Sequence, residues 1–381
     1  MPTRCGTNVV TKIYCDEQTT VRAHCNGEVV FGNLDCSTAK VTLLTKSGSI
    51  SGRYAMGMIG DATSGLIFGG RSGNSLYSDF VRYEVSGTTI TLTTLAATVR
   101  PWSQGIEWLS SLMGRSHLVM VGSPTSGVIV GGREMLTGHE QNTQGVYEYT
   151  VSGGNVAVQI TRGLASGAPA VWGGVGGFLT YGGLAYDDTG HHSLPWHFRL
   201  YTTHMLDPPN PGGATYTYHP PVDSEGSEIP VKHNSVVQND SSRASMSYVG
   251  NSNAGLIFGG MPPTNRAMSF VRSGQSVSAS ILPRSGVNIT PRWGAGMVGD
   301  VSAGTIFGGD SINSGGGDLS DFNCYVTSAT GIAYTTLSKT GATIDARREM
   351  GMVGRIDKFL IFGGIHSTRG AFNDFYLVEV T

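Results

Sequence analysis

A short apolar run that ends in two glycines occurs six times in this chain of 381 residues. Leu66-Ile67-Phe68 and Leu360-Ile361-Phe362 are two of these runs, and successive glycine pairs lie 62, 51, 77, 49 and 55 residues apart. A repeat of roughly 40–50 residues that contains several strands is typical of a β-propeller. The six pairs are Gly69-Gly70, Gly131-Gly132, Gly182-Gly183, Gly259-Gly260, Gly308-Gly309 and Gly363-Gly364.

Other strands recur around each glycine pair. A strand that opens with arginine precedes the pair, except in the third copy at 170–177. An aromatic strand follows the pair, as at Asp79-Phe80 and Asp321-Phe322, and a threonine-rich strand such as 90–95 closes the repeat. The repeated pattern therefore predicts six four-stranded units. The opening arginines are Arg53, Arg115, Arg243, Arg292 and Arg348.

The two ends of the chain predict how these units are joined. The last repeat stops after its third strand at Thr381, while residues 41–48 resemble the fourth strand at 334–341. We expect 41–48 to complete the last unit beside the C-terminal strand. This arrangement closes the ring and removes two exposed sheet edges.

The glycine pairs have two expected physical roles. Strands that converge on a narrow axis leave little room for side chains, and glycine allows the positive φ angles that end a strand sharply. Six equivalent placements make coincidence a poor explanation.

Residues 1–38 precede the repeats and are expected to form a small β-extension that packs on the propeller or docks to a neighbour, with a tight turn at Asn26-Gly27. Four cysteines in this segment are separated by 10, 10 and 11 residues, which is not a zinc-site spacing. We expect them to be reduced and half-buried, with disulfides and a metal site as open alternatives, and we expect Cys324 to pack in a strand. The four are Cys5, Cys15, Cys25 and Cys36.

The apolar run with its glycine pair, the aromatic third strand and the repeat spacing resemble Kelch repeats over roughly residues 39–381. The resemblance implies an all-β fold, a six-bladed propeller of Kelch type. Kelch units usually carry a tryptophan after the third strand, and no regular tryptophan occurs here.

Composition excludes several classes of function. Charged residues make up 14% of the chain, against about 25% in an average soluble protein, and the net charge is −2. Because no basic run occurs, we expect no nucleic-acid partner. No apolar stretch reaches the ~20 residues of a membrane span, and the first residues lack the apolar run of a secretory signal. We therefore expect a particle-associated or cytoplasmic protein.

The loops between second and third strands, and between fourth and first strands, are expected to share one face. The opening arginines (Arg53, Arg115, Arg243, Arg292, Arg348) would ring the axis there, and arginine suits carboxylate or phosphate recognition. The alternative is that each arginine holds a neighbouring loop through its carbonyls. Trp102 and Trp108 would lie on the same face, either exposed to a partner or buried against a neighbouring unit.

The third repeat carries a histidine-rich insert that resembles a metal-ligand cluster in composition. Carboxylate and imidazole groups together suit zinc, manganese or iron, although no two of them have a recognised spacing. A polar surface insert is the other interpretation. The candidate ligands are Asp187, Asp188, His191, His192 and His197.

Catalytic motifs are scarce, since the chain has no phosphate-binding glycine loop that leads into a helix and no nucleophile elbow. We therefore expect no catalytic residues, no cofactor, and a role in binding other proteins or a surface glycan. A virion or phage-tail component is the favoured hypothesis. The alternatives are an intracellular adaptor for an acidic peptide and a metal-dependent oxidase of the galactose-oxidase type.

Overall fold

The computed structural model describes residues 36–100, 112–136, 145–162 and 245–381, except 252, 262, 274–275 and 312–315, together with short strands elsewhere. Every regular element in the described residues is a β-strand. None of them forms a helix with the length and hydropathy that a bilayer crossing requires. Near the N-terminus, three two-residue strand pairs are β1–β2 (Arg4–Cys5, Asn8–Val9), β3–β4 (Cys15–Asp16, Thr19–Thr20) and β5–β6 (His24–Cys25, Glu28–Val29).

Four strands paired antiparallel form the basic unit of the fold. In unit 1 these are β9 (Gly57–Gly60), β10 (Ser64–Phe68), β13 (Phe80–Ser86) and β14 (Thr89–Arg100). Unit 2 contains β15 (Arg115–Gly122), β16 (Ser126–Leu136), β18 (Gly145–Ser152) and β19 (Asn155–Arg162). Unit 3 contains β20 (Ala170–Gly174), β21 (Gly177–Tyr181), β24 (Phe198–Met205) and β25 (Tyr216–His219).

The same pairing continues toward the C-terminus. Unit 4 contains β27 (Ser247–Gly250), β28 (Ala254–Phe258), β29 (Ala267–Ser273) and β30 (Ser276–Leu282). Unit 5 contains β32 (Gly296–Gly299), β33 (Ala303–Phe307), β34 (Phe322–Ser328) and β35 (Gly331–Thr336). Unit 6 contains β37 (Gly351–Gly354), β38 (Lys358–Phe362), β41 (Phe375–Val380) and β7 (Thr38–Leu43).

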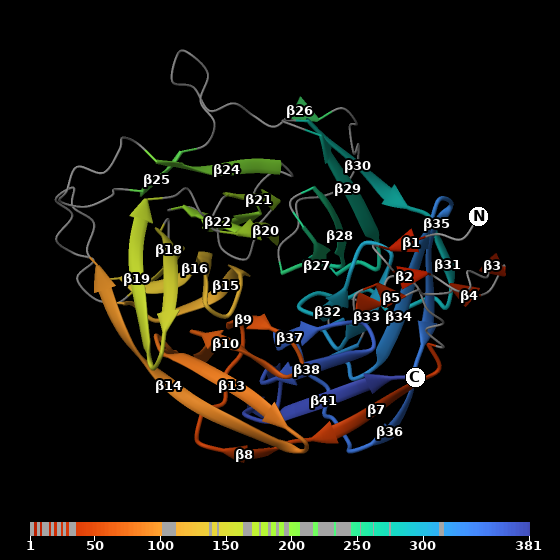
Figure 1. Cartoon of the computed structure of the whole chain (residues 1–381), viewed down its shortest axis with the longest axis horizontal. Helices are drawn as coiled ribbons and strands as arrows, with labels where there is room; N and C mark the ends of the chain where they lie inside the picture. Colours follow the sequence, from red (N-terminus) through yellow and green to blue (C-terminus); the bar gives the residue numbers. More distant parts are fainter. Residues whose placement is uncertain are drawn as a thin grey trace.

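The first strands of these units meet around a common centre (Figure 1). β9 contacts β15, β15 contacts β20, and the series continues through β27, β32 and β37, which contacts β9 again. Units 1 and 2 are also joined into one sheet, because the end of β14 pairs with β19 in parallel. The architecture is therefore all-β and propeller-like.

β7 occupies the place predicted for the N-terminal strand. It pairs antiparallel with β41 from Tyr376↔Leu43 to Val380↔Ala39. The N–H of Thr38 also donates to the carbonyl of Thr381 over 2.9 Å. The prediction that the two ends of the chain share one sheet is confirmed.

The strand expected at 41–48 is two strands rather than one. β7 ends at Leu43, and β8 (Thr45–Ser47) pairs in parallel with β14 of unit 1. β31 (Arg284–Gly286) and β36 (Ser338–Gly341) likewise pair with the outer strand of the next unit, β35 and β7. β26 (Lys232–His233) pairs in parallel with β30. We call β8, β31 and β36 the rim segments; each covers a sheet edge that would otherwise be exposed.

The hydrophobic core lies between the faces of adjacent units. Leu66 and Phe68 belong to a buried cluster shared with unit 2, whereas Ile67 between them belongs to a cluster shared with unit 6. Alternate residues of a strand point to opposite faces, so a strand buried on both faces is apolar throughout. This is the physical reason for the continuous apolar runs in the sequence.

The glycine pairs bind the next unit. Both glycines of each described pair have positive φ, for example 63° at Gly363 and 93° at Gly364. The N–H of Gly364 donates to the carbonyl of Arg53 over 2.9 Å, and a Cβ at Gly363 would overlap that same oxygen. The predicted positive φ is confirmed. The crowding comes from the carbonyl of the next unit rather than from side chains at the axis.

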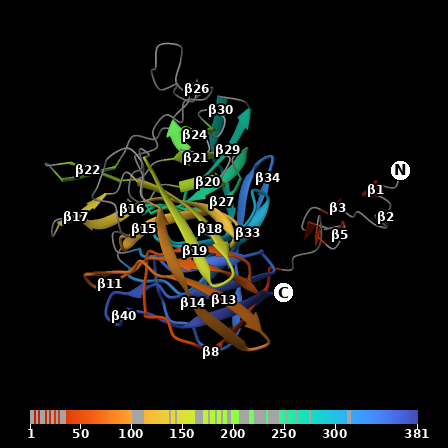
Figure 2. The same cartoon turned by 60° about the vertical axis from the view of Figure 1, so that its left-hand side comes forward.

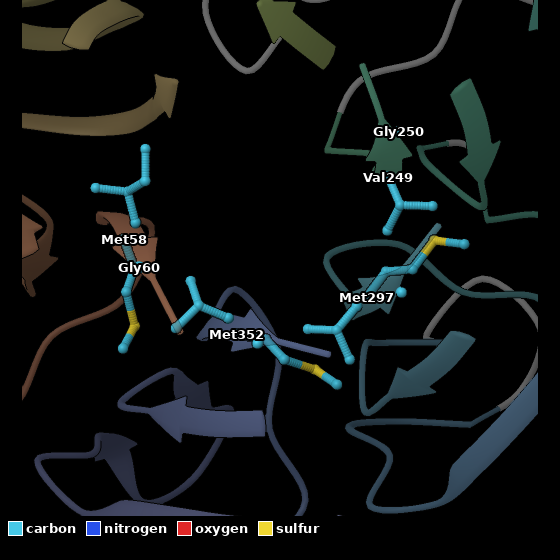
Figure 3. A pocket seen from close by; sticks show the side chains of 11 residues that line it. Met58, Gly60, Val249, Gly250, Met297 and Met352 are labelled. Carbon is cyan, nitrogen blue, oxygen red and sulfur yellow. The ribbon is translucent and has the colours of Figure 1, made fainter. Parts of the chain in front are cut away.

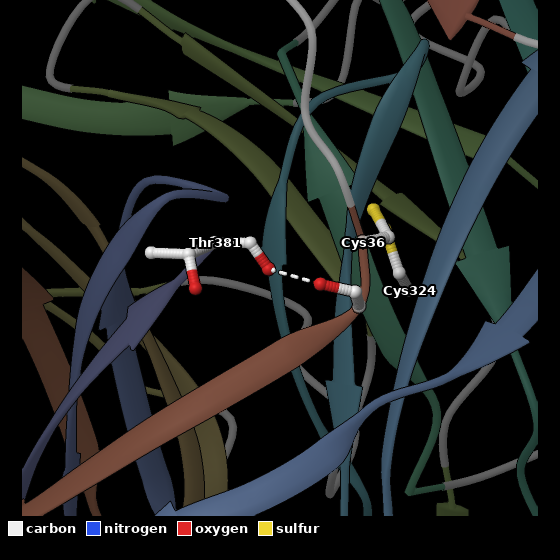
Figure 4. The surroundings of a disulfide bond; sticks show 4 residues. Cys36, Cys324 and Thr381 are labelled. Carbon is white, nitrogen blue, oxygen red and sulfur yellow. Dashed lines mark hydrogen bonds between the residues drawn. A yellow bond between two sulfur atoms is a disulfide. The ribbon is translucent and has the colours of Figure 1, made fainter.

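Cys36 and Cys324 form a disulfide with a Cα–Cα distance of 6.0 Å (Figure 4). The bond joins Cys36, which lies two residues before the start of β7, to β34 of unit 5. The expectations that Cys36 is reduced and that Cys324 only packs are therefore wrong. These cysteines lie 288 residues apart in the sequence, so their spacing carried no sign of the pairing.

Candidate functional site

Hairpins that follow the second strands lie on one face of the molecule. β11 (Arg71–Ser72) and β12 (Ser75–Leu76), β22 (Leu184–Asp187) and β23 (Gly190–Ser193), and β39 (Ile365–His366) and β40 (Gly370–Ala371) are paired strands of these connections. In unit 2, β17 (His139–Asn142) extends β16 in the same place. Figure 2 shows β11, β17, β22 and β40 on the same left-hand side. We call this side the loop face.

Four arginines, which we call the spoke arginines, are buried beneath the loop face. Arg53 donates from Nη1 and Nη2 to the two carboxylate oxygens of Asp79, over 2.6 and 2.9 Å. Its Nη1 also donates to the carbonyl of Gly69 over 2.9 Å. The side chain is 1% exposed, so a fixed charge is held in the interior by a bidentate partner. The spoke arginines are Arg53, Arg115, Arg292 and Arg347.

Arg292 and Arg347 repeat this arrangement with Asp321 and Asp374. Unit 2 differs, because Arg115 Nε donates to Glu134 of β16 over 3.2 Å and its guanidinium lies 3.5 Å from the Tyr147 ring centre. In unit 2 the carboxylate therefore comes from the second strand rather than from the residue before the third strand, and the arginine is buried as in the other units.

The spoke arginines hold loops, which was the alternative given for them above. At 0–1% exposure, Arg53, Arg115 and Arg292 do not present their guanidinium groups to a ligand. The equivalent residue in unit 6 is Arg347 and not Arg348, so that assignment is wrong by one position. Arg243 lies outside the described residues.

Arg348 instead belongs to the loop face. Its Nη1 lies 2.5 Å from Asp318 Oδ1 and 3.2 Å from Asp310 Oδ2, and its guanidinium lies 5.2 Å from the Trp293 ring centre. Because 17% of the side chain is exposed, Arg348 borders solvent where the spoke arginines do not.

In the described residues, a partial ring of four backbone hydrogen bonds runs around the axis, two residues after each spoke position and after Arg243. The N–H of His117 donates to Ala55, that of Ala55 to Glu349, that of Glu349 to Gly294 and that of Gly294 to Ser245, over 2.7 to 2.9 Å. All five residues have φ between 51° and 62°. A left-handed backbone is uncommon for non-glycine residues and clusters at functional sites. We call this ring the collar: Ala55, His117, Ser245, Gly294 and Glu349.

The side chains of two collar residues, His117 and Glu349, contact each other although Ala55 lies between them in the collar. His117 Nε2 lies 3.1 Å from Glu349 Oε1, although the two residues belong to units 2 and 6. Ala55 of unit 1 lies between them in the collar, and its methyl side chain leaves the space in which they meet. Both side chains are largely buried, with 14% and 10% exposure.

The Glu349 carboxylate is surrounded by cations. Burial alone would raise its pKa, but the charge and hydrogen bond of His117, with the charges of Arg348 and Arg133, hold the pKa of Glu349 below its ordinary value. Arg133 directly follows the Gly131-Gly132 pair. The collar therefore favours the ionised form of the Glu349 carboxylate.

Ser116, His117 and Glu349 are joined like a hydrolytic triad. Ser116 Oγ lies 3.1 Å from His117 Nδ1, and His117 Nε2 contacts the glutamate. Ser116 is completely buried, however, so its hydroxyl does not face a substrate. Its hydrogen bond orients the imidazole ring toward Glu349.

An open depression of about 220 Å³ lies between the first strands, near their C-terminal ends (Figure 3). It is lined by Met58, Met297 and Met352, with Val249 from unit 4. The sulfurs do not converge on a metal: a Cβ on Gly351 would meet Met58 Sδ, and one on Gly296 would meet Met352 Sδ. These methionines fill the space between units, as is usual for this residue.

The structure does not describe the side chains of the remaining candidate residues. Trp102, Trp108, Asp188 and His197 lie outside the described residues. Asp187, His191 and His192 belong to β22 and β23, of which only the strand pairing is described. In the ranges that the structure describes, no three His, Cys, Asp or Glu side chains form a metal-binding group.

No family model and no curated protein sequence matches the chain. A solved structure described as "Structure of YjhT" has a similar fold, with a TM-score of 0.56 and 13% sequence identity. The match covers 87% of this chain and 96% of that chain. At this identity the likeness concerns the fold alone.

Proposed function

We propose that this chain is a closed six-bladed propeller of Kelch type, with units 1 to 6 as its blades. The glycine pairs, the closing strand β7 and the contacts between successive first strands support this proposal. Residues 1–38 are proposed to be a separate docking extension.

The propeller acts by binding, and its loop face is the binding surface. The observation that carries this proposal is the collar, where His117 and Glu349 are held in left-handed backbone and meet at the axis. Side chains that the surrounding structure fixes in this way are suited to recognition. The partner is another protein of an assembly or a surface glycan, and the chain is a component of a larger particle such as a virion or phage tail.

A binding comparison tests the choice of face. Immobilised wild-type protein and the collar variant H117Q would be applied to a glycan array and to purified candidate assembly proteins. Arg355, which is 49% exposed in the β37–β38 connection on the opposite side, supplies the control variant R355A. We expect binding to be lost in H117Q and kept in R355A. Equal binding by both variants would reject the loop face.

The particle assignment has its own test. An antibody against the chain should label purified particles from the source of the sequence, and gene neighbours should encode capsid or tail proteins. Monomeric protein that is absent from every particle fraction would contradict the assignment.

The two alternative functions have less support. An acidic-peptide adaptor that uses the spoke arginines would have to reach buried guanidinium groups and displace the carboxylates that already pair with them. A metal-dependent oxidase would depend on the histidine-rich insert at 184–197, and trace-metal analysis of the purified protein is its direct test.

A further inference from the structure

The collar separates a backbone role from a side-chain role. Ala55, Ser245 and Gly294 belong to the same hydrogen-bonded series with side chains that are small or absent, and their φ angles match those of His117 and Glu349. The backbone series therefore requires neither an imidazole nor a carboxylate. His117 and Glu349, at φ of 54° and 55°, differ from the other members in that their side chains contact each other, and the backbone series does not need this contact.

The surroundings of Glu349 are those of a bound anion. His117 contacts one carboxylate oxygen, and the charges of Arg348 and Arg133 act on the same group. These three side chains come from units 2 and 6, and the imidazole adds a positive charge when it is protonated. Imidazolium and guanidinium groups are the usual partners of carboxylates in proteins.

We propose that the collar is a carboxylate-binding site in which Glu349 is the resident occupant, and that a carboxylate-bearing ligand on the loop face competes with Glu349 for His117. This inference rests on the proposed binding role and names the chemical group of the ligand. Because Glu349 is part of the chain, its effective concentration at the site is high. The wild-type protein should therefore bind small free carboxylates weakly, and removal of the Glu349 side chain should open the site.

The variant E349G tests the proposal with acetate as the probe. Glycine adopts the required φ without strain and already occupies the equivalent collar position in unit 5 as Gly294. The thermal midpoint would be measured at pH 7 while acetate replaces chloride at constant ionic strength. We expect a saturable rise of several degrees in E349G, with an apparent acetate affinity at least ten times that of the wild type.

The double variant H117A/E349G is the matched control, because it lacks the imidazole that contacts the carboxylate. Its midpoint should not respond to acetate. An equal response in all three proteins, or none in E349G, would overturn the proposal. If E349G does not fold, E349A replaces it, since Ala55 shows that alanine occupies a collar position at φ of 53°.

The acetate experiment tests the carboxylate site, and the partner experiments test the binding role of the loop face, so either proposal can fail without the other. A positive acetate response with no glycan or protein partner would leave the site intact and reject the binding role of the loop face. A partner whose binding depends on His117, combined with no acetate response, would keep the binding role and reject the carboxylate site.

Discussion

At the scale of single residues, the buried charges explain why the units keep their shape. A spoke arginine is held by one carboxylate and one loop carbonyl, so the first strand, the glycine pair and the start of the third strand are fixed together. Burying such an ion is costly unless all of these partners are present. The arrangement therefore favours one geometry strongly over its alternatives.

Removal of a spoke guanidinium should destabilise the protein markedly. R292M leaves the Gly308 carbonyl and the partly exposed Asp321 carboxylate without their donor, and losing a partner in this way costs about 1–3 kcal/mol. R355A, which removes only an exposed pair with Asp357, should cost less than about 1 kcal/mol. Urea unfolding followed by tryptophan fluorescence compares the two, and similar losses would contradict the assigned role.

The same pair predicts a loss of stability in acid. Burial would raise the pKa of Asp321, but hydrogen bonds and charge from Arg292, together with Asn323, lower it below its ordinary value. A lowered pKa in the folded protein stabilises above the unfolded pKa of about 3.9, and this stabilisation is lost as the pH falls through the folded pKa. The thermal midpoint of D321N should therefore be lower than that of wild type at pH 6, and the two should converge toward pH 3. A constant difference across this range would exclude the linkage.

The sequence contained the signal for the spoke arginines, but their partners were not recognised from it. Arg53, Arg115 and Arg292 each lie 16 residues before the first glycine of their pair, and the same count leads to Arg347 rather than Arg348. The aspartates that pair with three of them stand directly before the phenylalanine of the third strand. The pairing of His117 with Glu349 has no such signal, because it joins residues that are 232 positions apart.

At the scale of strands and turns, the glycine pairs and the rim segments join neighbouring units. The second glycine of a pair donates its N–H to the arginine carbonyl of the next unit, and a rim segment adds a parallel strand to the next sheet. The order of strands in each unit follows from the apolar and aromatic runs and was predictable. The division of 41–48 into β7 and β8 was not, because both halves have the same threonine-rich composition.

Alanine substitutions at two glycines with similar φ distinguish the effect of backbone strain from that of the contact between units. G308A introduces a methyl group where the carbonyl of Arg347 lies, at a φ of 66°. G87A has a φ of 58° with no atom within 4 Å of the new methyl group. We expect about 1 kcal/mol of destabilisation in G87A from strain alone and about 1–3 kcal/mol more in G308A. Equal effects in urea unfolding would show that the contact between units is unimportant.

At the scale of the whole molecule, the ends of the chain close the structure. β41 lies between β38 and β7, so it is an interior strand of its sheet even though it ends the sequence. The prediction of this closure from the sequence depended on one missing strand and one surplus strand. No comparable argument was available for the disulfide.

Deletion of residues 372–381 should unfold the domain. It removes β41 together with Phe375 and Val378, which are completely buried, and it leaves β7 without its antiparallel partner. Circular dichroism should show no cooperative transition for the truncated chain. A cooperative transition at the wild-type temperature would refute the closure.

The disulfide should stabilise the closed structure under oxidising conditions. It spans 288 residues, and disulfides typically contribute about 2–4 kcal/mol. C324S should therefore unfold at a lower urea concentration than the wild type, and the difference should disappear when both proteins are reduced. A difference that persists in reducing agent would point to packing of the Cys324 side chain instead.

The position of Cys36 has a mechanical consequence for anything attached to the first 35 residues. A force applied to that N-terminal segment acts on Cys36 before it acts on β7. The disulfide transmits the force to β34 of the neighbouring sheet. The hydrogen bonds between β7 and β41 therefore do not carry this force. Tethered by its tail, the oxidised protein would resist a force that could open the reduced one.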